Sequence, residues 1–134
     1  MSCADIIPFK KLYPGDIARP WLPVVIRNPH TNLSVKVWGL IDTGADECAV
    51  PAEYAPLLGH NLQAGSRKTI NTGNGQTAAY THTLCFETDS IKIDNVLIDF
   101  MPNLNVVLLG VKSFLSNFIL TVNYNNLTFS LEKY

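Results

Sequence analysis

The stretch Leu40-Ile41-Asp42-Thr43-Gly44-Ala45-Asp46 decides how this chain is interpreted. Two apolar residues lead into an Asp-Thr-Gly turn, and a second acid follows two residues after the glycine. A carboxylate at the end of a buried strand is costly unless hydrogen bonds and a specific role keep it there. Glycine lets the backbone approach closely, so its amide can point at the carboxylate. The pattern predicts an acid that holds and transfers protons, although the same residue types also suit an ordinary turn.

Length and composition exclude several classes of protein. The 134 residues suit one compact domain, and 47% hydrophobic against 16% charged residues is enough to form a core. A net charge of −1 without a basic run gives no indication of nucleic acid or membrane as a partner. No apolar run approaches the about 20 residues of a membrane helix, and no signal-peptide pattern is present. Three widely spaced cysteines without a CxxC pair favour reduced thiols, and we expect a cytoplasmic protein.

The chain divides into an arm and a domain. Prolines and a glycine interrupt residues 1–20, which are predicted to form an arm outside the core, and residues 21–134 form the domain. Residues 52–58 are predicted to form a short helical turn, and residues 111–117 the one sizeable helix. The remaining regular segments read as β-strands or hairpins: 21–27, 34–41, 69–86, 91–101, 105–109, 119–124 and 127–131. Many short strands at this spacing predict an all-β barrel or sandwich.

A second distinctive stretch is Gly73-Asn74-Gly75-Gln76-Thr77-Ala78. It formally matches the dinucleotide fingerprint G-x-G-x-x-A, and Asp94 lies about twenty residues on, where a ribose-binding acid is found. That fingerprint requires a helix that begins at the glycines, whereas the residues that follow lack a helical apolar stripe. We therefore prefer the tip of a β-hairpin that closes over a bound peptide and pairs with it as an added strand.

Other candidate sites are weaker. His30, His60 and His82 lack ligand spacing and are expected at the surface or in loops, although a metal site assembled from distant segments stays open. Cys48 has no adjacent base, so core packing is expected of it rather than nucleophilic catalysis. There is no G-x-S-x-G serine-hydrolase motif. No metal or organic cofactor is expected.

A third stretch, Leu108-Leu109-Gly110, ends 68 residues after Asp42, and the glycine-tipped hairpin lies between them. The order of strand, Asp-Thr-Gly-Ala, hairpin, apolar-apolar-glycine, helix and final strand resembles the retropepsin-like aspartic proteases over residues 21–131. The long C-terminal hairpin is more similar to cellular, bacterial and retroelement members than to viral ones. The resemblance implies a small closed or nearly closed all-β barrel with one short helix, active as a symmetric dimer.

The resemblance also implies roles for individual residues. The catalytic residues it implies are Asp42, Thr43 and Gly44, and the substrate-binding residues are Ala45, Asp46, Gly73, Asn74, Gly75 and Gln76. Retroviral members usually carry an arginine directly after the glycine of the apolar-apolar-glycine motif, which is Gly110 here. That arginine braces the acid that corresponds to Asp46. This chain has Val111 there, followed by Lys112. Either Lys112 or Arg19 takes this role, or Asp46 is satisfied in another way.

An aspartic protease needs two neighbouring carboxylates that share one proton. The chain holds one Asp-Thr-Gly and no second copy, so the other carboxylate must come from an identical chain. The prediction is a homodimeric aspartic endopeptidase, a hydrolase that acts on extended polypeptide segments. Two alternatives stay open: a non-catalytic peptide-binding or dimerisation module on the same fold, and an unrelated β-barrel that binds a small ligand.

Overall fold

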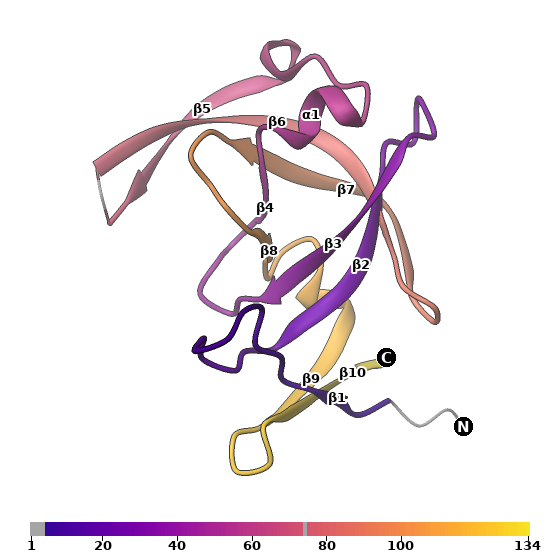
Figure 1. Ribbon diagram of the computed structural model, residues 1–134. Helices are drawn as coiled ribbons and strands as arrows, with labels where there is room; N and C mark the ends of the chain where they lie inside the picture. The colour runs from indigo at the N-terminus through magenta and orange to yellow at the C-terminus, as the bar shows by residue number, and fades with distance from the viewer. Residues whose placement is uncertain (1–4, 74) are drawn as a thin grey trace.

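The computed structural model describes residues 5–73 and 75–134 (Figure 1). Its strands are β1 (Ile7–Pro8), β2 (Trp21–Arg27), β3 (Ser34–Ile41), β4 (Cys48–Pro51), β5 (Ser66–Thr72), β6 (Gly75–Glu87), β7 (Lys92–Met101), β8 (Val107–Leu109), β9 (Phe118–Asn123) and β10 (Thr128–Lys133). The helical segments are α1 (Tyr54–Leu57) and the single 3₁₀ turns η1 (Leu62–Ala64) and η2 (Leu115–Asn117). Among the described residues, none of these helical segments has the length and hydropathy to span a membrane.

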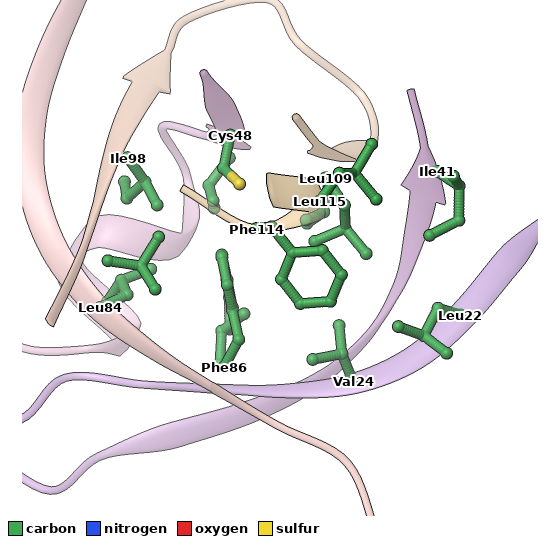
Figure 2. Close-up of a cluster of buried hydrophobic side chains, with 14 of the residues drawn as sticks. Leu22, Val24, Ile41, Cys48, Leu84, Phe86, Ile98, Leu109, Phe114 and Leu115 are labelled. Atoms are coloured by element: carbon green, nitrogen blue, oxygen red, sulfur yellow. The ribbon is translucent and has the colours of Figure 1, made fainter. Parts of the chain in front are cut away.

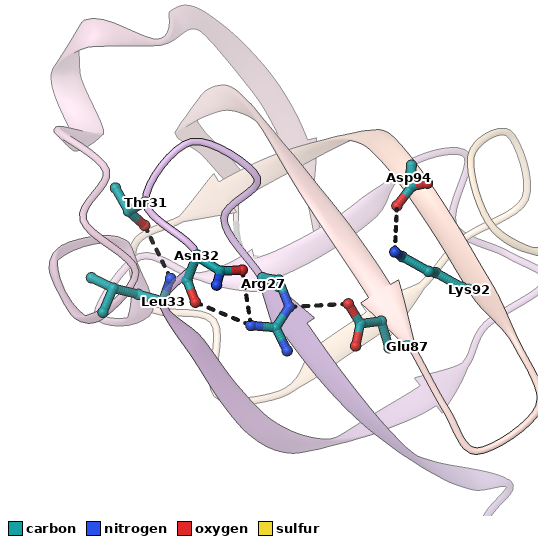
Figure 3. A network of polar contacts seen from close by, with 7 residues as sticks. All are labelled: Arg27, Thr31, Asn32, Leu33, Glu87, Lys92 and Asp94. Atoms are coloured by element: carbon teal, nitrogen blue, oxygen red, sulfur yellow. Dashed lines mark hydrogen bonds and ion pairs between the residues drawn. The ribbon is translucent and has the colours of Figure 1, made fainter.

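The larger sheet closes on itself. Its strand order is β2-β3-β8-β4-β7-β6-β5. Strand β2 also pairs with β6, so β2, β3, β8, β4, β7 and β6 form a closed barrel. At this seam Arg27 pairs with Cys85, and the Arg27 Nε donates to Glu87 Oε1 at 3.0 Å (Figure 3). Closure satisfies the backbone groups of strands that are otherwise edges. The prediction of a small closed all-β barrel is confirmed.

A second sheet, in the order β1-β10-β9, lies at one end of the barrel near both termini (Figure 1). Residues of the predicted arm lie against it. Ile7 pairs with Phe129, the Phe9 amide donates to the Leu127 carbonyl at 2.8 Å, and both Ile7 and Phe9 pack on the core. A bridge between Lys10 and Arg19 then folds the chain back toward β2. The domain boundary after residue 20 stays a prediction.

The core fills the interior of the barrel (Figure 2). Alternate residues of a strand point to opposite faces. Strand β7 accordingly buries Val96, Ile98 and Phe100, whereas Leu97 between them is exposed. Phe114 packs edge-on against Phe86 with ring centroids 5.8 Å apart, which joins the segment after β8 to the barrel wall. The strand predicted over residues 91–101 thus turns one apolar face toward the core.

Several predicted elements are confirmed. The helical turn in residues 52–58 is α1, which is followed by Gly59 at a φ of +76°. The hairpin in residues 69–86 consists of β5 and β6, and the C-terminal hairpin consists of β9 and β10.

The predicted helix over residues 111–117 is wrong, because only the turn η2 forms there. The Leu115 and Ser116 amides donate five residues back, to Gly110 and Val111, instead of four as in an α-helix. The side-chain amide of Asn117 donates hydrogen bonds to two further carbonyls, those of Ser113 and Phe114. Such side-chain bonds compete with helix formation.

Candidate active site

Strand pairing brings the two predicted motifs together. Strands β3 and β8 are parallel neighbours, with Leu40 opposite Leu108 and Ile41 opposite Leu109. Parallel strands leave the sheet at the same edge, so Asp42 and Gly110 emerge side by side although they are far apart in sequence. The Asp42 amide donates to the Leu109 carbonyl at 3.1 Å, which continues the ladder one residue beyond β3.

Hydrogen bonds fix the Asp-Thr-Gly turn. The Gly44 amide donates to Asp42 Oδ1 at 2.9 Å, and the Ala45 amide donates to the Asp42 carbonyl at 3.3 Å. Asp42 is half-buried, whereas Thr43 and Gly44 are exposed. The turn therefore holds one carboxylate oxygen of Asp42 by a backbone amide, as expected from the glycine, and presents the residue at the surface of the single chain.

The segment after β8 supports this turn from below. The Val111 amide donates to the Ala45 carbonyl at 2.9 Å, and the Lys112 amide donates to the Asp46 carbonyl at 2.8 Å. A Cβ added at Gly110 would overlap the backbone carbonyl groups of Glu47 and Ala45. The glycine is required because the two backbones touch at this point.

Cys48 is a supporting residue of the site that sequence reasoning placed only in the core. The side chain is fully buried, as expected, and its Sγ accepts a hydrogen bond from the Gly110 amide at 3.3 Å. Burial raises the pKa of the Cys48 thiol to about 12, so the sulfur is a neutral acceptor and no nucleophile. The continuous apolar run Cys48-Ala49-Val50-Pro51 is the available sequence signal for strand β4, although it lacks the alternation of a half-buried strand.

Neither Lys112 nor Arg19 braces the side chain of Asp46 in the way that the sequence suggested. Lys112 Nζ lies 3.5 Å from Glu47 Oε1, so its side chain pairs with the neighbouring acid and only its backbone contacts Asp46. Among the described residues, neither Lys112 nor Arg19 forms an ion pair with Asp46. Asp46 is exposed, and its carboxylate faces solvent in the single chain.

The predicted substrate-binding tip lies at the end of the β5–β6 hairpin. Asn71 pairs with Gln76, and Gly75 has a φ of +107°, a conformation that favours glycine. Gly73, Gly75 and Gln76 are exposed. The prediction for Asn74 falls outside the described residues. The hairpin and the Asp42 loop extend toward the same side of the molecule (Figure 1). No described hydrogen bond or ion pair joins Gly73 or Gln76 to the loop.

The histidines form no metal-ligand cluster, since the described residues contain no group of three His, Cys, Asp or Glu placed to hold a metal ion. His82 lies in strand β6 and is partly buried, so it is not a loop residue. The His60 and His82 rings are 4.6 Å apart and both contact Phe100. Each Nε2 lies within hydrogen-bond distance of a backbone carbonyl, that of Thr83 for His60 and that of Leu62 for His82. Burial lowers the pKa of His60, and the neighbouring imidazole of His82 adds to this effect.

A groove of about 800 Å³ lies away from the Asp42 loop. Its walls come from β2, β3, β10 and residues 87–91, and Asp42 is not among its lining residues. The predicted active site at Asp42 is therefore identified by the hydrogen bonds of its loop, and it does not coincide with this groove.

An Asp-Thr-Gly loop held against an apolar-apolar-glycine segment, on a closed barrel with a long hairpin, defines the class of retropepsin-like aspartic proteases. The family model described as "gag-polyprotein putative aspartyl protease" matches residues 32–117. The chain belongs to this family. A search of curated proteins found no match.

Solved structures show the same fold. A retropepsin-like aspartic protease from Rickettsia conorii is similar over 96% of this chain and 99% of its own, with a TM-score of 0.68 and 23% identity. The retroviral protease-like domain of Ddi1 from Leishmania major covers 88% of this chain and 95% of its own, with a TM-score of 0.60 and 12% identity. The protease of EIAV, in complex with the inhibitor HBY-793, covers 73% of this chain and 86% of its own, with a TM-score of 0.50 and 20% identity.

Proposed function

We propose that the protein is an aspartic endopeptidase whose catalytic pair consists of Asp42 from each of two identical subunits. The observation that carries this proposal is the Asp42 turn itself. One carboxylate oxygen is held by the Gly44 amide at 2.9 Å, and the whole turn rests on the segment after Gly110. Since the chain has one Asp-Thr-Gly, a symmetric dimer is the simplest source of a second equivalent carboxylate.

The chemistry follows from placing two carboxylates side by side. Like charges at that distance cannot both ionise, so the pair shares one proton. The ionised carboxylate removes a proton from a water molecule, which attacks the scissile carbonyl carbon, while the protonated carboxyl donates a hydrogen bond to the carbonyl oxygen. In this arrangement Thr43 joins the two turns across the two-fold axis and Gly44 orients the carboxylate.

The substrate is proposed to be an extended polypeptide. Ala45, Asp46 and the hairpin tip, Gly73 to Gln76, contact its backbone, and the hairpin pairs with it as an added strand. Cys48 and Cys85 are buried free thiols, which fits a reducing compartment, and we place the protein in the cytoplasm.

The test is cleavage of a peptide library under mildly acidic conditions by the wild type and by Asp42→Asn. We expect pepstatin-sensitive cleavage by the wild type and at least a ~10³-fold loss in the variant, since one member of the acid–base pair is gone. Asp94→Asn is the matched control, because Asp94 is an exposed acid on β7 that makes only a 4.0 Å pair with Lys92.

Equal activity of the wild type and Asp42→Asn would exclude the catalytic pair. Binding of peptides without cleavage by either protein would instead favour the non-catalytic module on the same fold.

A further inference from the structure

Asp99 is a buried carboxylate that the fold alone does not explain. It lies on β7 with 3% of its surface exposed, and only Asn28 is a comparably buried polar residue in the described part of the chain. Both carboxylate oxygens have partners. Thr81 Oγ1 donates to Oδ1 at 3.1 Å, and Lys68 Nζ lies 2.9 Å from Oδ2. A buried carboxylate with this arrangement is an anchoring point for the lysine.

Lys68 reaches Asp99 across an intervening strand. Lys68 lies on β5 opposite Ala79 of β6, whereas Asp99 lies on β7 on the far side of β6. Ala79 is fully buried, and its small side chain leaves room for the aliphatic part of a lysine to pass over it. The pair therefore fixes the ammonium group of a hairpin residue over the barrel wall.

The pairing register puts this ammonium group on the same face as the approach to Asp42. Leu40 is opposite Leu108, and Leu108 is opposite Ala49. Ala49 is opposite Asp99, which in turn is opposite Thr81. Directly opposed residues share a face of the sheet. The row therefore runs from Leu40, two residues before Asp42, to Asp99, over about 14 Å at the usual strand spacing.

This row lies on the face that does not form the core. On β7 the neighbours of Asp99, Ile98 and Phe100, point into the core, so Asp99 points away from it. Leu40 and Leu108 are only half-buried. About four residues of extended peptide span the distance from Leu40 to Asp99. A peptide cleaved at Asp42 thus has a side chain within reach of Lys68.

Resting on the proposed function, we infer that Lys68 is a specificity-determining residue that binds a hydrogen-bond-accepting side chain of the substrate, an amide or a carboxylate. The two partners differ in accessibility, because the Lys68 side chain is 43% exposed and that of Asp99 4%. Asp99 has both oxygens occupied, whereas an ammonium group has three donors and Asp99 takes one. The exposed group at this point is therefore the Lys68 ammonium, a hydrogen-bond donor. A substrate side chain that binds to it must be a hydrogen-bond acceptor.

The test measures cleavage-site preferences with a library in which Asn, Gln, Asp, Glu, Leu, Met, Lys and Arg vary at each position. The wild type is expected to prefer acceptor side chains over Leu and Met roughly tenfold at one position, as one hydrogen bond to a charged group provides. Comparing Gln with Glu and Asn with Asp distinguishes the amide from the carboxylate.

Variants assign this preference to Lys68. Lys68→Met is expected to lose it at that position alone. The double variant Lys68→Met/Asp99→Asn is expected to lose it too, without leaving a buried charge that could impair folding. Lys68→Arg is expected to retain it. Lys92→Met, which removes an exposed lysine of β7, is the matched control and is expected to keep the wild-type profile.

Three results overturn the inference: an unchanged profile in both Lys68→Met proteins, an equal loss of cleavage for all peptides, or a wild-type preference for Lys and Arg at the position. An equal loss would assign the pair a purely structural role, and a basic preference would assign recognition to Asp99. These outcomes leave the proposed function intact, whereas a wild type that cleaves no peptide removes the proposed function and this inference together.

Discussion

The Asp42 loop and the β5–β6 hairpin both contain glycines and extend toward the same side of the molecule, but they are held in different ways (Figure 1). The loop is hydrogen-bonded to a segment distant in sequence, through Val111 and Lys112. The hairpin consists of β5 and β6, and β5 is the edge strand of the sheet, paired with β6. Toward its base, Lys68 contributes the contact with Asp99 on β7.

This difference separates two physical requirements of the proposed chemistry. A carboxylate that transfers protons must keep its position to within a fraction of an ångström, and contacts from several chain segments provide that. A segment that closes over a substrate must move, so it is drawn from parts with few buried contacts. Perturbing the loop should therefore cost more stability and activity than perturbing the hairpin tip.

The largest effect is expected from Gly110→Ala. The added methyl group meets the backbone of Glu47 and Ala45, which cannot yield as a flexible side chain does. We expect a loss of about 3 kcal/mol in the free energy of unfolding and loss of cleavage, measured by chemical denaturation and a peptide assay. Gly73→Ala is the matched control, because open space surrounds that position, and its effect should stay within about 0.5 kcal/mol. Similar destabilisation by both substitutions would contradict the comparison.

A smaller effect is expected from Cys48→Ala. The substitution removes the sulfur that accepts the Gly110 amide and leaves a small void in the core. We expect destabilisation by about 1–2 kcal/mol, together with a fall in kcat that exceeds the change in KM. Cys85→Ala also removes a buried thiol, but on β6 and without a contact to Gly110, so kcat should be unchanged in that protein. Equal changes of kcat in both variants would show that Cys48 acts through core packing alone.

The smallest effect concerns pH at the base of the hairpin. The pKa of His60 is lower in the folded chain than its ordinary 6.5, because of burial and the adjacent His82. The unfolded chain therefore binds a proton first as the pH falls below 6.5, and stability decreases until the folded pKa is passed. We expect a loss of about 0.5 kcal/mol or less between pH 7 and pH 5.5, since the ring is only partly buried. His60→Gln should flatten this dependence, whereas His30→Gln should change it far less, because the exposed His30 makes the smallest contribution to the lowered pKa of His60. An unchanged slope in His60→Gln would refute the assignment.

Local sequence patterns predicted much of the barrel. Runs rich in β-forming residues marked β2 and β7, and glycines marked the hairpin tip and the end of α1. Strand β4 escaped detection because its four residues are all buried and do not alternate. The segment after Gly110 has the apolar content of a helix, but bonds spanning five residues and the Asn117 side chain terminate it as a short turn.

Only the local part of the candidate site, the Asp-Thr-Gly turn, could be predicted from the sequence. The Asp-Thr-Gly turn uses local hydrogen bonds, and these follow from residue type and spacing. The contact of Cys48 with Gly110, the pairing of Lys112 with Glu47, and the approach of Lys68 to Asp99 depend on strand order and register. Register across non-adjacent strands is a property of the assembled sheet, so no local pattern contains it.

The central claim is that two identical chains supply the catalytic pair, and mixing wild type with Asp42→Asn tests it most directly. The two proteins are combined at one to nine, allowed to exchange subunits, and assayed for cleavage per wild-type chain. Random pairing leaves about one wild-type chain in ten with a wild-type partner, so activity per wild-type chain should fall to about one tenth. Activity per wild-type chain that is unchanged by the excess of Asp42→Asn, after exchange has been verified with labelled subunits, would contradict the account.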